Sequence, residues 1–216
     1  MIDPCKVVRL FPLPNVVLFP RAILPLHVFE ERYKLMMADA LEHDGQIAMA
    51  LLKPGWVKEY YAQPAIEPVV CVGRIVSYER LPDGKYNLLL QGMQRAKIEK
   101  EVTGKTYRQA RIKLLESAVV SEIDLSCERW RLQELFLQGE LGTMGKHYKD
   151  LLGSGLKTAE IADLLAFNLL ECTQTKQSLL AETDVVVRVR RIVDLLQSII
   201  PMIRQSARQS ADAAMN

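Results

Sequence analysis

Long apolar runs and a secretory signal are both missing from this sequence. No stretch of about 18 consecutive apolar residues occurs, and a helix needs roughly that many to span a bilayer. The N-terminus, Met1 to Pro4, lacks the basic start and the apolar core of a signal peptide. The sequence therefore predicts a chain that neither spans nor crosses a membrane and that stays in the cytoplasm.

Paired cysteines and clustered histidines are missing as well. The cysteines are too widely spread for a CxxC pair or for the disulfide ladder of a small secreted domain, which favours free thiols: Cys5, Cys71, Cys127 and Cys172. The histidines have no H-E-x-x-H spacing and no cysteine neighbours: His27, His43 and His147. We therefore predict no metal site and no cofactor.

An excess of charge of one sign is the third absence. The chain has 28 Lys and Arg against 26 Asp and Glu, a formal net charge of +2. Such a balance does not favour nucleic acid as a partner, because phosphate binding relies on a strongly basic surface. The hydrophobic fraction of 49% and the charged fraction of 25% are instead those of a folded globular protein.

Motifs for phosphate binding and nucleophilic catalysis are incomplete. A P-loop requires G-x-x-x-x-G-K-[ST], but the glycines before Lys146 have the wrong spacing and His147 follows the lysine. Ser154 stands between two glycines without the G-x-S-x-G pattern of a nucleophile elbow. We therefore predict that the chain is not an enzyme; a small hydrolase with an unrecognised site is the remaining catalytic alternative.

The first half, residues 1–117, shows the pattern of a β-rich domain. Its apolar residues fall in short runs separated by proline and glycine. Residues 95–102 alternate, which predicts a strand with Arg95 on its wet face, and residues 69–76 are apolar on both faces, as in a central strand. A tight hairpin turn is predicted at residues 81–85, and apolar spacing after Glu31 predicts one helix.

The second half, residues 118–216, changes to helical periodicity. The clearest stripe predicts one long amphipathic helix: Val185, Val189, Ile192, Leu196, Ile199 and Ile203. Thr183 is predicted to cap this helix, Pro201 to kink it, and residues 205–216 to fray. Helices are also expected from residue 126 onward and over residues 158–172, which together predict a C-terminal helical bundle.

Four segments resemble the N-terminal domain family of Lon proteases. The opening, residues 10–33, reads LFPLPNVVLFP and then LPLHVFEERY after a short gap, which is similar to the family's signature. Residues 72–75 (VGRI), 90–95 (LQGMQR) and 107–110 (YRQA) resemble its later strands, in the family's order. The leucine pattern from residue 158 to 200 is similar to the helical part that follows.

The resemblance implies an α+β fold: a PUA-like β pseudo-barrel with one or two helices, followed by the helical bundle. It implies a non-catalytic module that binds unfolded or client polypeptide in proteolysis or protein quality control, as a stand-alone bacterial relative. A separate protease or ATPase is a further candidate partner, because Lon's own ATPase and Ser-Lys protease belong to other domains.

The aromatic segment after Gly55 is our predicted peptide contact: Trp56, Tyr60 and Tyr61. The alternative partner is RNA, because PUA-like barrels elsewhere bind RNA and basic residues crowd two neighbouring strands: Arg95, Lys97, Lys100, Lys105, Arg108, Arg111 and Lys113. Glu99 and Glu101 interrupt that surface and favour an ordinary solvated face. The apolar stripe of the last helix could serve a homodimer as readily as an intramolecular bundle.

Overall fold

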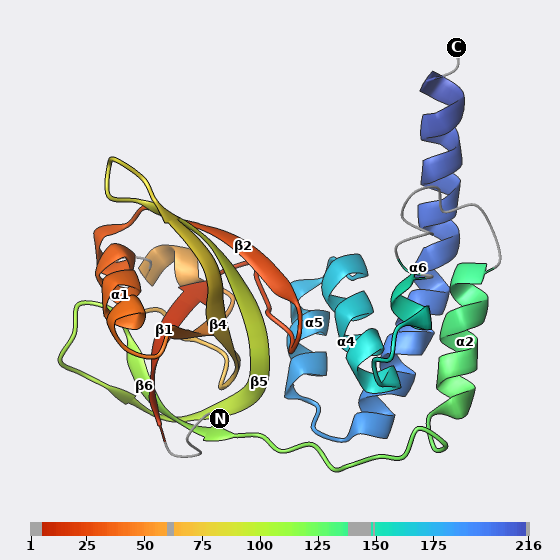
Figure 1. Ribbon diagram of the computed structural model, residues 1–216, viewed down its shortest axis with the longest axis horizontal. Coiled ribbons are helices and arrows are strands. Elements are labelled where there is room, and N and C mark those ends of the chain that lie inside the picture. The colour runs from red at the N-terminus through yellow and green to blue at the C-terminus, as the bar shows by residue number, and fades with distance from the viewer. Residues whose placement is uncertain (1–5, 60–62, 138–147, 149, 215–216) are drawn as a thin grey trace. The chain divides into compact units, whose positions relative to one another are not determined.

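The computed structural model describes residues 6–59, 63–137, 148 and 150–214 (Figure 1). In chain order the elements are β1 (Val7–Leu13), β2 (Ile23–Val28), α1 (Glu31–Glu42), β3 (Gln46–Leu51), the 3-10 helix η1 (Trp56–Glu59), β4 (Val69–Arg80), β5 (Tyr86–Val102), β6 (Gln109–Leu114), α2 (Ser126–Leu137), α4 (Thr158–Leu169), α5 (Thr173–Ala181) and α6 (Val185–Ala214). The predicted α+β class is confirmed.

Internal contacts divide the chain into two compact units. The first, here the β unit, comprises Met1–Glu116 and Glu171–Ala181; the second, here the helical unit, comprises Ser117–Leu170 and Glu182–Asn216. Helix α5 thus belongs to the β unit although it stands between two helices of the other unit. The predicted domain boundary at residue 117 stays a prediction.

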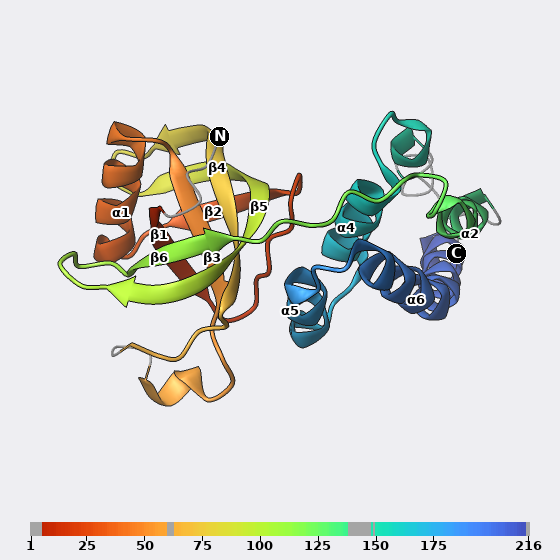
Figure 2. The same ribbon diagram turned by 90° about the horizontal axis from the view of Figure 1, so that it is seen from below.

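Six strands form the sheet of the β unit. Their order is β2-β5-β4-β3-β1-β6, and β6 also pairs with β5, so that five of the strands close into a ring and β2 is added outside it (Figure 2). Strands β1 and β3 are parallel, and the other pairs are antiparallel. Closure by the long strand β5 leaves β2 as the end strand of the sheet.

The core of the β unit lies inside this ring. Alternate residues of the ring strands point inward, as the period of a strand requires, and pack together: Val8, Leu10, Ala48, Ala50, Val70, Val72, Ala96, Ala110 and Ile112. Helix α1 buries Tyr33, Met36, Met37 and Ala40, the face predicted from its spacing. The Tyr33 ring lies 4.5 Å from that of Phe11, which fixes α1 against β1.

The predicted hairpin and central strand are both confirmed. Leu81 and Lys85 close the turn with a backbone hydrogen bond of 2.8 Å, and Gly84 adopts a φ of 79° that glycine tolerates without strain. Strand β4 lies between β5 and β3 and is buried from Val69 to Gly73. Beyond Arg74 it becomes exposed, because there it pairs with β5 outside the closed part of the ring.

Arg95 corrects the predicted alternation of β5. Its side chain was expected on the wet face, but it is buried, and its Nε donates to the carbonyl oxygen of Leu180 at 3.1 Å. Arg95 thereby satisfies a carbonyl at the C-terminal end of α5, where cations are favoured. Gln177 of the same helix donates its side-chain N–H to the carbonyl oxygen of Val69 at 2.8 Å. Two buried polar contacts therefore hold α5 on the β unit.

In the helical unit, α6 is the helix on which α2 and α4 pack. Its predicted stripe is buried from Val185 to Leu196, as the apolar period requires. A buried ion pair crosses this contact: Arg188 Nε lies 3.1 Å from an Asp163 carboxylate oxygen. Among the described residues, α6 is helical to Ala214, beyond residue 205, where fraying is predicted to begin.

Two further local predictions are corrected in the helical half. The cap of α6 is Asp184 and not Thr183, because Asp184 accepts the N–H of Val187 at 3.0 Å on its carboxylate. The helix expected over residues 158–172 ends at Leu169, and α5 begins separately at Thr173. The break lets the chain leave the helical unit and place α5 in the β unit.

Candidate binding surfaces of the β unit

A shallow groove runs across the outer face of β2, β5 and β4. It has a volume of about 470 Å³ and is lined by Pro25, Leu26, His27, Ser77, Tyr78, Glu79, Asn87, Leu88 and Leu89. Strand register arranges this face in rows. Pro25 and Ser77 both lie opposite Leu89, and His27 and Glu79 both lie opposite Asn87. The groove therefore has a row that contains the apolar residues Pro25 and Leu89 beside a row of three polar residues.

The apolar part of this face is exposed to solvent. Leu89 is 40% exposed, and Ile23, which lies opposite Gln91 on the same face, is 51% exposed. In the polar row, His27 Nδ1 lies 2.7 Å from the Asn87 side-chain oxygen. Exposed apolar side chains that stand beside oriented polar groups are typical of protein-binding surfaces.

The free edge of β2 borders this groove. Gly92 donates its N–H to the carbonyl oxygen of Ala22 at 2.8 Å, which makes these two residues a hydrogen-bonded pair. Such pairs alternate along an antiparallel ladder, so the backbone groups of Leu24, Leu26 and Val28 face β5. Those of Ile23, Pro25 and His27 face outward, and proline at the middle position removes one donor from the edge.

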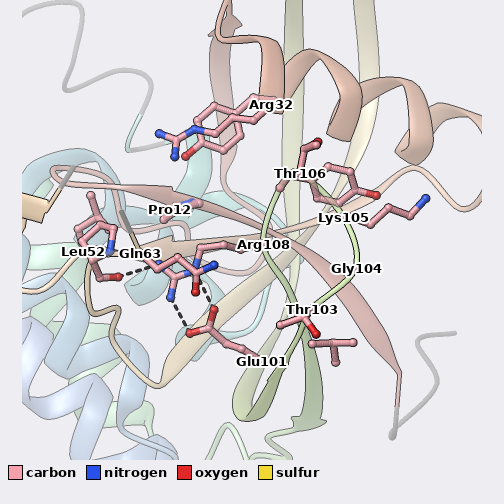
Figure 3. Close-up of a pocket in the computed structure, with 14 residues that line it drawn as sticks. Pro12, Arg32, Leu52, Gln63, Glu101, Thr103, Gly104, Lys105, Thr106 and Arg108 are labelled. Atoms are coloured by element: carbon pink, nitrogen blue, oxygen red, sulfur yellow. Dashed lines mark hydrogen bonds and ion pairs between the residues drawn. The ribbon is translucent and has the colours of Figure 1, made fainter. Parts of the chain in front are cut away.

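A larger and more polar cavity lies at the opposite end of β5 (Figure 3). Its volume is about 590 Å³, and its lining comes from β1, α1, the segment before β4 and the β5–β6 hairpin: Pro12, Arg32, Tyr33, Leu52, Gln63, Pro64, Glu101, Val102, Thr103, Gly104, Lys105, Thr106, Tyr107 and Arg108. The lining thus carries three cations and one carboxylate.

Arg108 makes three hydrogen bonds at the cavity. Its Nε and Nη2 donate to the two carboxylate oxygens of Glu101 at 2.8 and 2.5 Å, and its Nη1 donates to the carbonyl oxygen of Pro64 at 2.7 Å (Figure 3). The side chain of Arg108 is 12% exposed and that of Glu101 is 39% exposed. The Nε and Nη2 groups of Arg108 therefore form a bidentate pair with the carboxylate of Glu101 at the cavity.

Two other cations line the cavity, and each is paired with a carboxylate that lies outside the lining. Arg32 stacks on the Tyr33 ring at 4.6 Å and binds Glu30 through Nε at 3.0 Å. Lys105 Nζ lies 3.4 Å from an Asp39 carboxylate oxygen. Neither Glu30 nor Asp39 lines the cavity. Each cation of the lining is therefore paired with a carboxylate, either in the cavity or just behind its wall.

Asp39 joins the cavity wall to the core. It accepts a hydrogen bond from Arg9 Nε at 2.5 Å and one from the Tyr107 hydroxyl at 2.6 Å. Burial alone would raise the pKa of Asp39, but the hydrogen bonds from Tyr107 and Arg9 outweigh it and lower the pKa from 3.8 to about 2. Burial and the neighbouring Asp39 raise the pKa of Tyr107 to about 12. This network is structural, because it fixes α1 and the β5–β6 hairpin to β1.

Of the three predicted peptide contacts, one lies among the residues that the structure describes. Trp56 begins η1 and is half-buried, and it lines neither the groove nor the cavity. Tyr60 and Tyr61 lie outside the described residues. Sequence reasoning did not find the groove or the Glu101–Arg108 pair, because both depend on which residues face one another across strands.

Only some of the basic residues of β5 and β6 lie on one surface. Arg95 is buried against α5, and Arg108 is paired with Glu101. Four exposed cations lie opposite one another across the two strands, Lys97 with Lys113 and Lys100 with Arg111, and the exposed acids Glu99 and Glu101 stand beside them on β5. This group is shorter than the continuous positive stripe that tracks a phosphate backbone.

Candidate metal ligands do not gather in the described part of the chain. Within it, no cluster of three or more His, Cys, Asp or Glu side chains could hold a metal ion. His43 Nδ1 lies 2.7 Å from the backbone oxygen of Asp39, and Ser154 donates its hydroxyl to the carbonyl oxygen of Leu151 at 2.6 Å. The glycines before Lys146 and the adjacent His147 lie outside the described part of the chain.

No helix in residues 6–59, 63–137 and 150–214 is both long and apolar enough to cross a bilayer.

Comparison with known proteins identifies the family. Residues 7–198 match the family described as the ATP-dependent protease La (LON) substrate-binding domain, and the chain belongs to it. The match covers the β unit and most of the helical unit. The resemblance seen in the four sequence segments is thereby confirmed.

The particular relatives are Lon proteases of bacteria. The Lon protease of Dictyoglomus thermophilum is 27% identical over 193 residues, which cover 88% of this chain and 24% of that protein. The Lon protease of Escherichia coli K12 is 25% identical over 214 residues, which cover 93% of this chain and 26% of that protein. The chain thus spans about a quarter of the length of these relatives.

Two solved structures share the fold. The N-terminal domain of the Mycobacterium avium complex Lon protease superposes with a TM-score of 0.70 at 15% identity, covering 89% of this chain and 98% of that one. The Lon N-terminal domain protein of Xanthomonas campestris superposes with a TM-score of 0.65 at 22% identity, covering 88% and 98%.

Proposed function

We propose that this chain is a non-catalytic module that binds unfolded or client polypeptide on the outer face of β2, β5 and β4. The observation that carries the proposal is the apolar row around Leu89, exposed beside the end strand of the sheet. An extended polypeptide can place apolar side chains in such a groove and form backbone hydrogen bonds with the edge. Membership of a substrate-binding domain family supports the same function.

The groove suits a polypeptide better than a small molecule. It is shallow and lies across three strands, whereas small-molecule sites are concave and enclose most of the ligand. Pro25 interrupts the edge of β2, which allows a few backbone hydrogen bonds but not a long added strand. Binding would therefore be adaptable and of modest affinity, as a recognition step for many sequences requires.

The test is the affinity for a permanently unfolded protein, such as a reduced and alkylated one, measured by fluorescence anisotropy. Leu89→Ser should weaken binding about fivefold, because roughly 1 kcal/mol of apolar contact is lost. Leu35→Ser is the matched control, since Leu35 is an exposed leucine of α1 that does not line the groove. Equal affinities of the two variants would refute the proposed groove.

The proposal extends to the finer features of the fold and setting. The ring closed by β5 and β6 supports a PUA-like pseudo-barrel, and the packing of α2 and α4 on α6 supports a helical bundle. A cytoplasmic location, a separate protease or ATPase as partner, and a homodimer through α6 are parts of the same hypothesis.

The RNA-binding alternative has less support, because the exposed cations Lys97, Lys100, Arg111 and Lys113 are few and Glu99 and Glu101 lie beside them on β5. Retention of RNA on a filter, tested over a range of salt concentrations, would decide that alternative directly.

A further inference from the structure

The cavity at the β5–β6 hairpin has a feature that structural packing does not require. Arg108 is fixed by the Pro64 carbonyl and presents its fork toward the cavity, while its partner Glu101 is more than a third exposed. Solvent screens a carboxylate that is this exposed, although the bidentate geometry strengthens the pair. The bond to the Pro64 carbonyl would keep one arm of the guanidinium in place if Glu101 left it.

We propose that this cavity is a carboxylate-binding subsite for polypeptide, in which an acidic group of the ligand replaces Glu101 on Arg108. The inference rests on the proposed polypeptide-binding function and names a chemical class of ligand for it. Arg108 would form the same two parallel hydrogen bonds with the incoming carboxylate that it now forms with Glu101.

The charges of the cavity favour this ligand. Of the three cations in its lining, Arg32 and Lys105 are paired with Glu30 and Asp39, so a ligand carboxylate would take the place of Glu101 as the partner of Arg108. Displacement of Glu101 into solvent would leave its site to a ligand carboxylate without breaking the bond from Arg108 to Pro64. The side chains of Gln63 and Thr103 also line the cavity and can donate hydrogen bonds to a carboxylate or an adjoining amide.

The size of the cavity is consistent with a short polypeptide end or an acidic side chain with its backbone. At about 590 Å³ it lies within the range of pockets that take small ligands, about 300 to 1,000 Å³. A carboxylate has two sources in a polypeptide, the side chain of Asp or Glu and the C-terminal carboxyl group. Both would bind the Arg108 fork in the same way.

Three synthetic peptides of one apolar sequence distinguish these sources. The first contains an internal Glu and ends in an amide, the second contains Gln instead and ends in a free carboxylate, and the third contains Gln and ends in an amide. Affinities for the full-length protein are measured by fluorescence anisotropy. We expect the first or second peptide to bind more tightly than the third.

The variant Glu101→Gln is the decisive one, because it removes the competing charge. The Kd of the preferred carboxylate peptide should fall about fivefold, the range of an exposed ion pair, while the Kd of the neutral peptide stays unchanged. Asp83→Asn is the matched control, since it removes an exposed carboxylate from Lys85 in the β4–β5 turn. Arg108→Gln should abolish the preference, and Arg108→Lys should restore part of it.

Thermal unfolding of each variant shows that the hairpin remains folded. An unchanged or weaker affinity of Glu101→Gln for both carboxylate peptides would overturn the subsite, and the neutral peptide would still report on the groove. Binding of none of the three peptides would overturn the proposed function together with the subsite. A preference that survives in Arg108→Gln would also overturn the assignment to this cavity.

Discussion

The carbonyl oxygen of Phe19 lies 2.0 Å from the point where a Cβ atom on Gly92 would stand. The same Phe19 presents its ring to Arg95, whose guanidinium carbon is 5.8 Å from the ring centre. The LQGMQR segment therefore packs against the β1–β2 connection through two of its residues. Its glycine and arginine serve the fold of the β unit.

Gly92→Ala should destabilise the β unit severely, by about 3 kcal/mol or more, because a methyl group would overlap a backbone atom that cannot move independently. Gly153→Ala is the control, since no atom lies within 4 Å of its added Cβ and its φ is not in the left-handed region. Urea unfolding of both variants measures the difference. Equal stability would show that Phe19 moves away at little cost.

Arg95→Met should loosen α5 while leaving the ring of strands folded. The variant loses the bond to the Leu180 carbonyl, and an unpaired buried carbonyl costs about 1 to 3 kcal/mol. Amide hydrogen exchange should become faster in α5 than in α1. The neighbouring exposed residue Lys97, changed to Met in the same way, should leave the exchange of α5 unaltered.

Asp39→Asn should remove part of the acid sensitivity of the protein. The folded-state pKa of Asp39 is about 2 against 3.8, so its stabilisation is present above pH 3.8 and is lost as the pH falls through 2. The difference corresponds to about 2 kcal/mol at neutral pH. Unfolding free energies measured between pH 5 and 2 should fall more steeply in the native protein than in the variant.

Asp163→Ala should destabilise the helical unit by about 3 kcal/mol, because it leaves the buried Arg188 without its carboxylate. The double variant Asp163→Leu with Arg188→Met should recover most of that loss, since two apolar residues need no partner. Chemical denaturation followed by circular dichroism compares them. A double variant as unstable as the single one would show that Arg188 contributes mainly through the Glu182 carbonyl, to which it also donates.

Trp56 can report on the predicted aromatic contact. The chain has two tryptophans, and Trp130 of α2 is 60% exposed, so Trp130→Phe leaves Trp56 as the single fluorophore at little cost. Addition of an unfolded protein should shift the emission of Trp56 if the segment from Trp56 to Tyr61 contacts the ligand. An unchanged spectrum at saturating ligand would remove this segment from the binding surface.

Spacing in the sequence predicted those elements that depend only on residues close together in the chain. The turn at residues 81–85, the buried face of α1 and the stripe from Val185 to Leu196 follow from sequence spacing and are confirmed. Arg95 was misplaced because strand alternation assumes one wet face, whereas α5, a helix 78 residues later in the chain, covers that position. The end of α4 was missed because leucines continue through residue 170.

The candidate sites were beyond sequence reasoning for a related reason. Glu101 and Arg108 are paired only because the β5–β6 hairpin folds one onto the other, and the groove exists only because Pro25, Leu89 and Ser77 fall in one cross-strand row. Glu101 and Arg108 entered the sequence analysis as charges of a candidate RNA surface, and Arg108 and Pro25 as parts of family segments. The strand register determines which residues lie opposite one another, and the register depends on how all the strands of the ring pair.

Helix α5 packs on the β unit although the residues before and after it belong to the helical unit, and this affects how the β unit can be isolated. A fragment that ends at residue 116 would contain all six strands but would lack α5. Arg95, the Val69 carbonyl and the apolar surface that α5 covers would then be exposed to water. To express the β unit alone, residues 171–181 should be joined to its C-terminal end by a flexible linker. A protease nick in the 117–125 stretch would likewise fail to liberate it.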